Sequence, residues 1–257
     1  EKVRHARQFY SASELGSIST DRLAVFGQQF QRGTRSAVHT KVNRFDADAN
    51  LKAIAEARRQ SDWLVFSFHN HEFGDTGRLT ADTDVGLAEP GRFMVEFARA
   101  AIDAGADVVT GHGPHLTLGA EIYRDRPIFY SLGNFIFQND TVEQFPSEAY
   151  RRFGLGHDAT PADFLDARTD KDTRGFPAEA EFWEGCVARV AFEAGKLARV
   201  ELHPIDLGFG NRRAERGRPV LANGAKADRI LERLQRLSQH HETATTREGD
   251  ALVLKLR

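Results

Sequence analysis

Residues 63–72 read WLVFSFHNHE, an almost uninterrupted apolar run that ends directly at two histidines. A run of aromatic and β-branched residues is typical of a strand that is buried on both faces, as in a helix-covered sheet. Residues 107–115 repeat the arrangement, because the short run DVVT leads into GHGPH. Ligands bind at the carboxyl ends of strands in open α/β sheets. Both histidine pairs are therefore predicted at one such edge.

Helical patterns precede and separate these two runs. Asp46 or Asp48 can cap a helix in which Leu51 and Ile54 have helical spacing. A second helix is predicted from Pro90 to Gly105, with Phe93, Met94, Phe97, Ala101 and Ile102 forming its buried stripe. The alternation of strands and helices indicates an α/β fold.

The rest of the chain continues with strands, a long irregular stretch and one more helix. The irregular stretch covers residues 138–183, and a segment of that length in a compact domain is usually functional or disordered. The further predicted elements are strands at 120–123, 128–132 and 252–254, a hairpin of 186–192 with 197–202, and a helix at 224–239.

The composition excludes several classes of protein. The chain has 257 residues, 40% hydrophobic and 28% charged, which is ordinary for a globular protein, and its net charge of −2 gives no electrostatic reason to expect nucleic acid as a partner. The one cysteine, Cys186, excludes an intrachain disulfide and a cysteine-rich zinc site. Inside a predicted strand it is also a poor candidate for a nucleophile.

The histidine pairs carry the chemistry. Neutral imidazole is the commonest protein ligand for zinc and other first-row metals. Gly111 and Gly113 are expected to let the backbone turn sharply, so that His112 and His115 face a common point. At the other strand end, one of His69 and His71 is expected as a ligand, and the other either as a group that contacts a ligand or as a proton-transfer group. Glu72 has three open roles: metal ligand, partner that orients a histidine, or general base.

Other polar residues are weaker candidates. Asn134 either contacts substrate or stabilises its own turn. His203 lies in a predicted strand from which it can approach the site, whereas His240 and His241 are read as the solvated end of a helix. Three aspartates of a polar loop are further candidate ligands: Asp75, Asp82 and Asp84.

Residues 104–115, AGADVVTGHGPH, followed by residues 127–135, PIFYSLGNF, closely resemble the CapA family of poly-γ-glutamate capsule proteins. That family belongs to the calcineurin-like metallophosphoesterase superfamily. The resemblance runs from Asp46 to Asn139 and resumes more loosely over Pro204–Ser238. It implies a four-layer α/β sandwich, two β-sheets between helices. Residues 1–257 would then be the C-terminal portion of a single domain with an insertion at about 138–183.

The resemblance also implies a site. His69, His112 and His115 would be ligands of two divalent metal ions (Mn, Fe or Zn). In the hydrolase hypothesis built on the resemblance, His71 and Glu72 are the catalytic candidates for proton transfer, and Asn134 is the candidate for substrate binding. This sequence has HNHE where the family more often has His-Trp-Gly-x-Glu, which leaves the roles of His71 and Glu72 open.

The first three metal motifs of the superfamily, an early Asp, a bridging carboxylate and an Asn-His pair, have no counterpart before His69. They are expected in an N-terminal fragment or a second chain that completes the site. The same expectation follows from the start of the chain at Glu1, since its only methionine is Met94.

The function implied by the resemblance is a metal-dependent hydrolase that acts on a phosphoester or a γ-glutamyl amide in capsule polymer metabolism. Its partners would be an anionic polymer or a small phosphoester, and its place the cell envelope. One alternative is a non-catalytic component that binds or exports the polymer, and another is a degraded domain with one metal or none. Five basic residues of the insertion would suit polymer binding, although their acidic neighbours favour a solvated loop: Arg151, Arg152, Arg168, Lys171 and Arg174.

Overall fold

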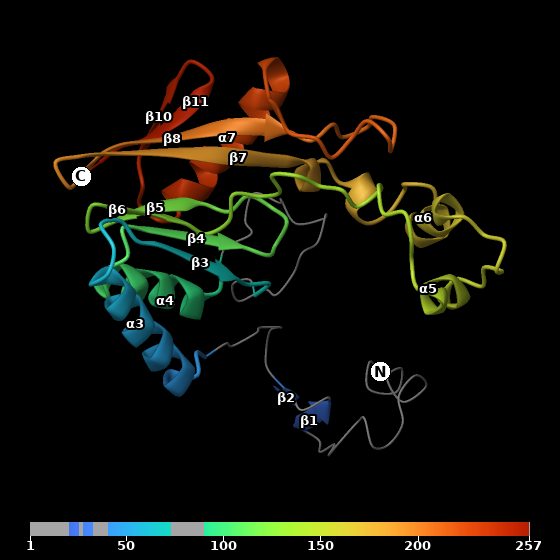
Figure 1. Cartoon of the computed structure of the whole chain (residues 1–257), viewed down its shortest axis with the longest axis horizontal. Coiled ribbons are helices and arrows are strands. Elements are labelled where there is room, and N and C mark those ends of the chain that lie inside the picture. The colour runs from blue at the N-terminus through green and yellow to red at the C-terminus, as the bar shows by residue number, and fades with distance from the viewer. Residues whose placement is uncertain (1–20, 26–27, 33–40, 73–89, 257) are drawn as a thin grey trace. The chain divides into compact units, whose positions relative to one another are not determined.

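The computed structural model describes residues 21–25, 28–32, 41–72 and 90–256 (Figure 1). The chain divides into two compact units, residues 1–39 and residues 40–257. In the first unit, β1 (Arg22–Val25) and β2 (Gln28–Gln31) form an antiparallel hairpin. All other described elements belong to the second unit.

One sheet of the second unit carries both histidine motifs. Its strand order is β3 (Val65–His69), β4 (Val108–His112), β6 (Arg126–Phe129) and β5 (Ala120–Tyr123). The first three strands are parallel, and β5 is antiparallel to β6. β6 corresponds to the strand predicted at 128–132, and it begins and ends earlier than expected. The tight turn at Asp125, between β5 and β6, has left-handed backbone.

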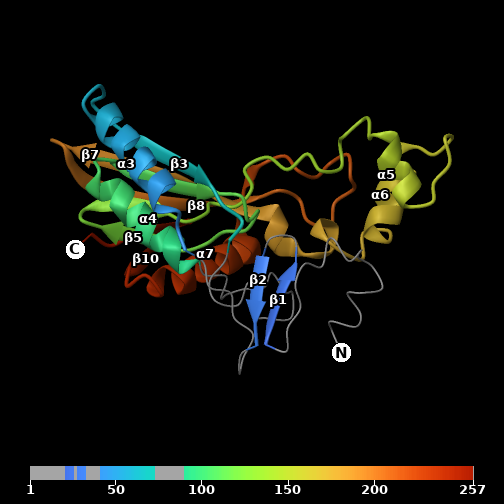
Figure 2. The ribbon, with the colours of Figure 1, turned by 90° about the horizontal axis from the view of Figure 1, so that it is seen from below.

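Two helices lie side by side on one face of this sheet (Figure 2). They are α3 (Arg44–Arg58) and α4 (Arg92–Asp103), and Ile54 and Ala98 pack with Ile128 of the sheet. The predicted cap of the first helix was wrong. The helix begins earlier, because the side chain of Asn43 accepts a hydrogen bond from the backbone N–H of Phe45. No described helix is long and apolar enough to span a membrane.

The second sheet is antiparallel and faces the first (Figure 1). Its order is β10 (Thr245–Glu248), β11 (Ala251–Leu254), β8 (Lys196–Asp206) and β7 (Glu184–Glu193), with β9 (Val220–Leu221) paired to β8. Helix α7 (Gly224–Gln239) packs Ile230 and Leu234 into the core that the two sheets share. The predicted α/β sandwich of two sheets flanked by helices is confirmed.

The sequence-based description of β3 as a strand buried on both faces is wrong for this chain. Among the described strands β3 lies at the edge of its sheet, and Val65, Ser67 and His69 are exposed. Val65 is 61% exposed, and Trp63, just before the strand, is 50% exposed.

The stretch 138–183 is folded rather than irregular. It contains α5 (Ser147–Arg152), α6 (Pro161–Thr169) and two short 3-10 helices, η2 (Phe176–Ala178) and η3 (Ala180–Trp183). Helices α5 and α6 lie side by side because Tyr150 packs against Phe164, with ring centroids 5.5 Å apart (Figures 1 and 2). The sequence indicated an irregular stretch because no apolar period here is long enough to reveal such short helices.

Arg216 fastens this insertion to the rest of the unit. Its guanidinium pairs with Asp140 and Asp172 and lies 4.7 Å from the ring centroid of Trp183. The side chains of Arg216 and Asp140 are 4% and 3% exposed, so the pair is shielded from water. A buried pair of this kind is costly to break, since either partner left alone is an uncompensated charge.

Arg216→Ala should therefore lower the free energy of unfolding by about 3–5 kcal/mol. Arg151→Ala serves as the control, because Arg151 and its partner Glu148 are 71% and 73% exposed. Such exposed pairs are worth less than about 1 kcal/mol. Urea unfolding of both variants measures the difference, and equal midpoints would contradict the anchoring role of Arg216.

Candidate functional site

The two histidine motifs meet because β3 and β4 are parallel neighbours that end together. His69 is the direct register partner of His112, and the backbone N–H of Asn70 donates to the carbonyl oxygen of His112 over 2.8 Å. The prediction that both motifs lie at one carboxyl edge of the sheet is confirmed.

The imidazoles form a chain with His69 at its centre. His69 Nδ1 lies 3.1 Å from Nδ1 of His112, and His69 Nε2 lies 2.8 Å from Nε2 of His71. The ring of His71 in turn lies 6.2 Å, between centroids, from the ring of His115. All four predicted histidines are thus brought together.

Glycines allow this close approach, in two different ways. Gly113 has a φ of +122°, and a Cβ there would lie 2.5 Å from the carbonyl oxygen of Asn70. Gly111 does not turn the backbone as predicted. It lies inside β4, and a Cβ would lie 2.3 Å from the carbonyl oxygen of Tyr130. His115 itself has a φ of +62°, and such strain in a residue other than glycine often marks a functional site.

Asn134 holds His115 in place. Asn134 Nδ2 donates to the carbonyl oxygen of Phe182 over 2.8 Å, so its Oδ1 is free to accept from Nδ1 of His115, also 2.8 Å away. A histidine that donates through Nδ1 carries its lone pair on Nε2, the nitrogen left for a ligand. The rings of Phe137 and Phe176 flank the imidazole at 5.9 and 5.3 Å. Asn134 therefore positions a histidine, and its role in substrate binding stays a prediction.

The charge state of His112 suits metal binding. Partial burial, and next to it the neighbouring His69, lower the pKa of His112. The neutral imidazole, which is the form that binds metals, is therefore favoured at neutral pH.

Glu72 is the least constrained member of the predicted site. Its side chain is exposed, and its backbone N–H and carbonyl group bond to the side chain of Asn70. Among the described residues, no hydrogen bond joins the carboxylate of Glu72 to a histidine. The candidate ligands Asp75, Asp82 and Asp84 lie outside the described residues.

The donors have the right chemistry for a divalent metal ion, but the described part of the chain does not complete a site. Within it, no three His, Cys, Asp or Glu side chains are arranged to hold one ion. The reason is geometric. His69 approaches His112 through its Nδ1 and His71 through its Nε2, and these two nitrogens lie on opposite sides of the His69 ring. The described histidines therefore have donors suited to a metal ion but do not by themselves make up a metal site.

The structure decides the open position of His203 and overturns the prediction for His241. His203 does not approach the site, because its ring faces Glu201 within a network of surface charges on β8. His241 is half-buried rather than fully solvated. Its ring packs on Tyr130 with centroids 4.5 Å apart, and burial lowers the pKa of His241 to about 4. Cys186 is buried, and burial raises the pKa of its thiol to about 12, which agrees with its poor prospects as a nucleophile.

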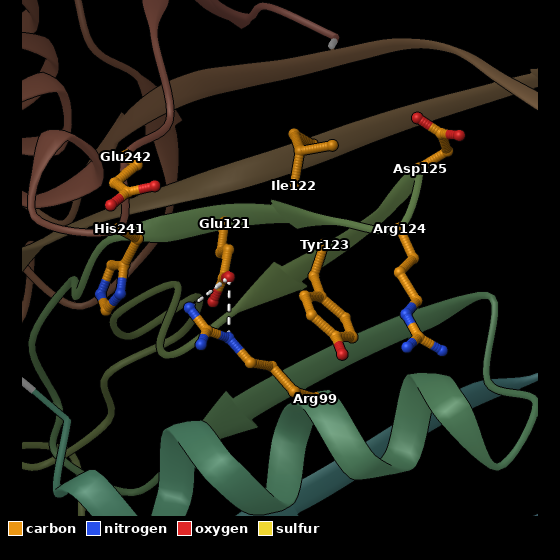
Figure 3. A pocket seen from close by; sticks show the side chains of 8 residues that line it. All are labelled: Arg99, Glu121, Ile122, Tyr123, Arg124, Asp125, His241 and Glu242. Atoms are coloured by element: carbon orange, nitrogen blue, oxygen red, sulfur yellow. Dashed lines mark hydrogen bonds and ion pairs between the residues drawn. The ribbon is translucent and has the colours of Figure 1, made fainter.

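His241 also lines a pocket of about 460 Å³ beside β5 and α4, away from the histidine cluster (Figure 3). Glu121 in this pocket accepts hydrogen bonds from Arg99 and from the hydroxyl of Tyr130. Arg124 pairs with Asp103. Since these charges satisfy one another, we interpret the pocket as structural.

The half-buried His241 predicts a pH dependence of stability. Its folded pKa is about 4, below the unfolded value of about 6.5, so folding favours the neutral ring. The free energy of unfolding therefore has its full value, with respect to His241, above about pH 6.5. It falls by on the order of 1–3 kcal/mol as the pH is lowered from about 6.5 to about 4. His241→Phe keeps the ring contact and should flatten the unfolding free energy across this window. An unchanged slope in urea unfolding would contradict this account.

The family model described as "Bacterial capsule synthesis protein PGA_cap" matches residues 8–139, which include both histidine motifs. The chain belongs to this family. The match reaches further toward the N-terminus than the resemblance from Asp46 had indicated.

Curated relatives extend the match. "Uncharacterized protein y4sH" of Sinorhizobium fredii is 36% identical over 245 residues, which is 91% of this chain and 50% of that protein. "PGA biosynthesis protein CapA" of Bacillus subtilis is 35% identical over 130 residues, 46% of this chain and 31% of that protein. "Capsule biosynthesis protein CapA" of Bacillus anthracis is 52% identical over 94 residues, 35% of this chain and 20% of that protein. The chain thus spans about half the length, or less, of these relatives.

Proposed function

We propose that the chain supplies the histidine side of a metal-dependent hydrolytic site in a protein of capsule polymer metabolism. The observation that carries the proposal is the parallel register of β3 and β4, which places His69 beside His112 at the end of the sheet. Family membership supports the capsule setting, and the clustering of the imidazoles supports metal-dependent chemistry.

His69, His112 and His115 would hold the metal, which we take to be two divalent ions, Mn, Fe or Zn. Bound ions would lower the pKa of a coordinated water and neutralise negative charge on the substrate. His112 is kept neutral, and His115 is oriented by Asn134. The missing ligands would come from an N-terminal fragment or a second chain.

The chain's own residues can also move a proton. His71 shares a short nitrogen contact with His69 and is exposed to solvent on its other side, as is Glu72. In the proposed site, His71 passes a proton between the bound substrate and solvent. The Glu72 carboxylate then accepts it or holds His71 in position.

The substrate is proposed to be a phosphoester or a γ-glutamyl amide. The name of the Bacillus subtilis relative refers to PGA biosynthesis, and the name of the Bacillus anthracis relative refers to capsule biosynthesis. The cell envelope is the proposed location, and it rests on membership of the capsule synthesis family alone.

A second candidate function is binding or export of an anionic polymer without catalysis. Two observations support it. Among the described residues, no three His, Cys, Asp or Glu side chains are arranged to hold one metal ion, and the basic residues of the insertion are exposed. Of these residues, Arg151 already pairs with Glu148, which weakens the case for a continuous basic face.

The two functions are separated by His112→Ala combined with His115→Ala in the full gene product. The double variant should lose bound metal and lower the turnover of an aryl phosphodiester or a γ-glutamyl anilide by at least about a hundredfold. Metal is measured by mass spectrometry of the purified protein. His203→Ala is the matched control, because His203 lies on β8 with Glu201 as its partner. Unchanged metal content in the double variant would rule out the site, and metal binding without turnover in the parent would favour the second function.

Asn134→Ala tests the positioning of His115. Loss of the bond to Nδ1 should weaken metal binding or turnover by about 10–100-fold, because partners that orient a ligating histidine have effects of this size. Asn50→Ala is the control, since that side chain bonds only within α3 among the described residues. Substrate contact alone would raise KM and leave metal affinity unchanged, so the two readouts separate the two roles of Asn134.

A further inference from the structure

Asn223 is the one asparagine of this chain that precedes a glycine. It lies between β9 and α7, at the N-terminal cap of the helix. Each of the other six asparagines is followed by a residue with a side chain. A side chain on the following residue hinders access to its backbone nitrogen, whereas glycine leaves that nitrogen accessible. The sequence therefore singles out residues 223–224 as a place where a side-chain amide can react with the next backbone nitrogen.

The side chain of Asn223 makes no hydrogen bond within the described part of the chain. In particular, it does not cap α7, although asparagine at this position commonly does so. Most of the other asparagines hold their side chains in hydrogen bonds: Asn43, Asn50, Asn70, Asn134 and Asn139. Asn223 is also exposed, so that its amide is open to water and free to change its conformation.

Gly224 presents the attacking nitrogen. Its N–H belongs to the first turn of α7, where backbone N–H groups have no carbonyl partner within the helix. A Cβ at Gly224 would meet nothing within 4 Å, so the space beside this residue is open. Ring closure requires ψ of Asn223 to rotate away from its value of 168°. Such a rotation opens only the end of α7, and helix ends open at little cost in free energy.

We propose that Asn223 is a site of spontaneous deamidation in the folded protein. The backbone nitrogen of Gly224 attacks Cγ of Asn223, the bond between Cγ and Nδ2 breaks, and the amide nitrogen leaves as ammonia with the proton of the attacking N–H. The product is a five-membered succinimide ring, and its closure is favoured because the reacting atoms belong to neighbouring residues. Water then opens the ring. Cleavage between Cγ and the ring nitrogen gives aspartate, and cleavage between the backbone carbonyl carbon and that nitrogen gives isoaspartate.

The two products act on α7 in opposite ways. Aspartate places a negative charge at the N-terminus of a helix that has no acidic residue in its first turn, where such a charge is favourable. Isoaspartate adds a methylene group to the backbone between Ala222 and Ala227, which are 6% and 0% exposed. Since the N–H of Ala222 donates to the carbonyl oxygen of Pro204 over 2.9 Å, the longer backbone has to break this bond or displace α7. The modification concerns α7 and does not depend on the proposed chemistry of the histidines.

Peptide mapping of the full gene product, aged in the folded state, tests the site. Trypsin releases residues 217–226, which contain Asn223, and residues 200–212, which contain Asn211. Asn211 is the matched internal control, because it is equally exposed but precedes Arg212 instead of a glycine. The peptide of residues 217–226 should gain about 1 Da, as an amide becomes a carboxylate, at least about tenfold faster than the control peptide. A freshly purified sample gives the background of the digestion.

Asn223→Gln is the control for the chemistry. It keeps an exposed amide at the same place, but the longer side chain has to close a larger and less favourable ring. An isoaspartyl methyltransferase should therefore methylate residues 217–226 of the aged parent and leave the same peptide of the variant unlabelled. Equal mass gain in the two peptides of the parent would overturn the proposal. Conversion that occurs only after the protein is unfolded in urea would also overturn it, because the fold would then protect Asn223.

Discussion

The parallel pairing of β3 with β4 is the constraint on which the histidine cluster depends. Because His69 and His112 are register partners, their side chains leave the same end of the sheet on neighbouring strands. A slip of one residue would send His69 to the opposite face of the sheet. The register is fixed by the apolar pattern of β4 against the helices and by the glycines that let the two strand ends approach, with Gly113 against the carbonyl oxygen of Asn70.

A second link connects the cluster to the insertion. Asn134 bonds at once to His115 and to the backbone of Phe182, so one amide joins a candidate ligand to the end of the insertion. The insertion is held in turn by Arg216, which pairs with Asp140 and Asp172 and lies over Trp183. The orientation of His115 therefore depends on residues far along the chain, and changes in the insertion can reach the site without touching it.

Local patterns in the sequence were enough to predict the elements that frame the site. The boundaries of α7, the hairpin of β7 and β8, and the placement of both histidine pairs at strand ends followed from apolar period and turn residues alone. Long, strongly periodic segments carry that information in a few consecutive residues.

Most of the failures concern contacts between residues that are distant in the sequence. Burial of β3 depends on which strands lie beside it, and burial of His241 depends on the ring of Tyr130. The role of Gly111 depends on the backbone of Tyr130, which lies against it. The capping of α3 by Asn43 is a milder failure, because several suitable capping residues lie near one another.

The central proposal is that His69, His112 and His115 are ligands in a metal site to which residues beyond the described ones contribute. Anomalous diffraction from crystals of the full gene product grown with Mn²⁺ or Zn²⁺ tests it most directly. We expect anomalous density bonded to imidazole nitrogens of His69 and His112, with carboxylate or amide ligands from residues outside this chain. Crystals with ordered metal elsewhere and none at these imidazoles would contradict the claim.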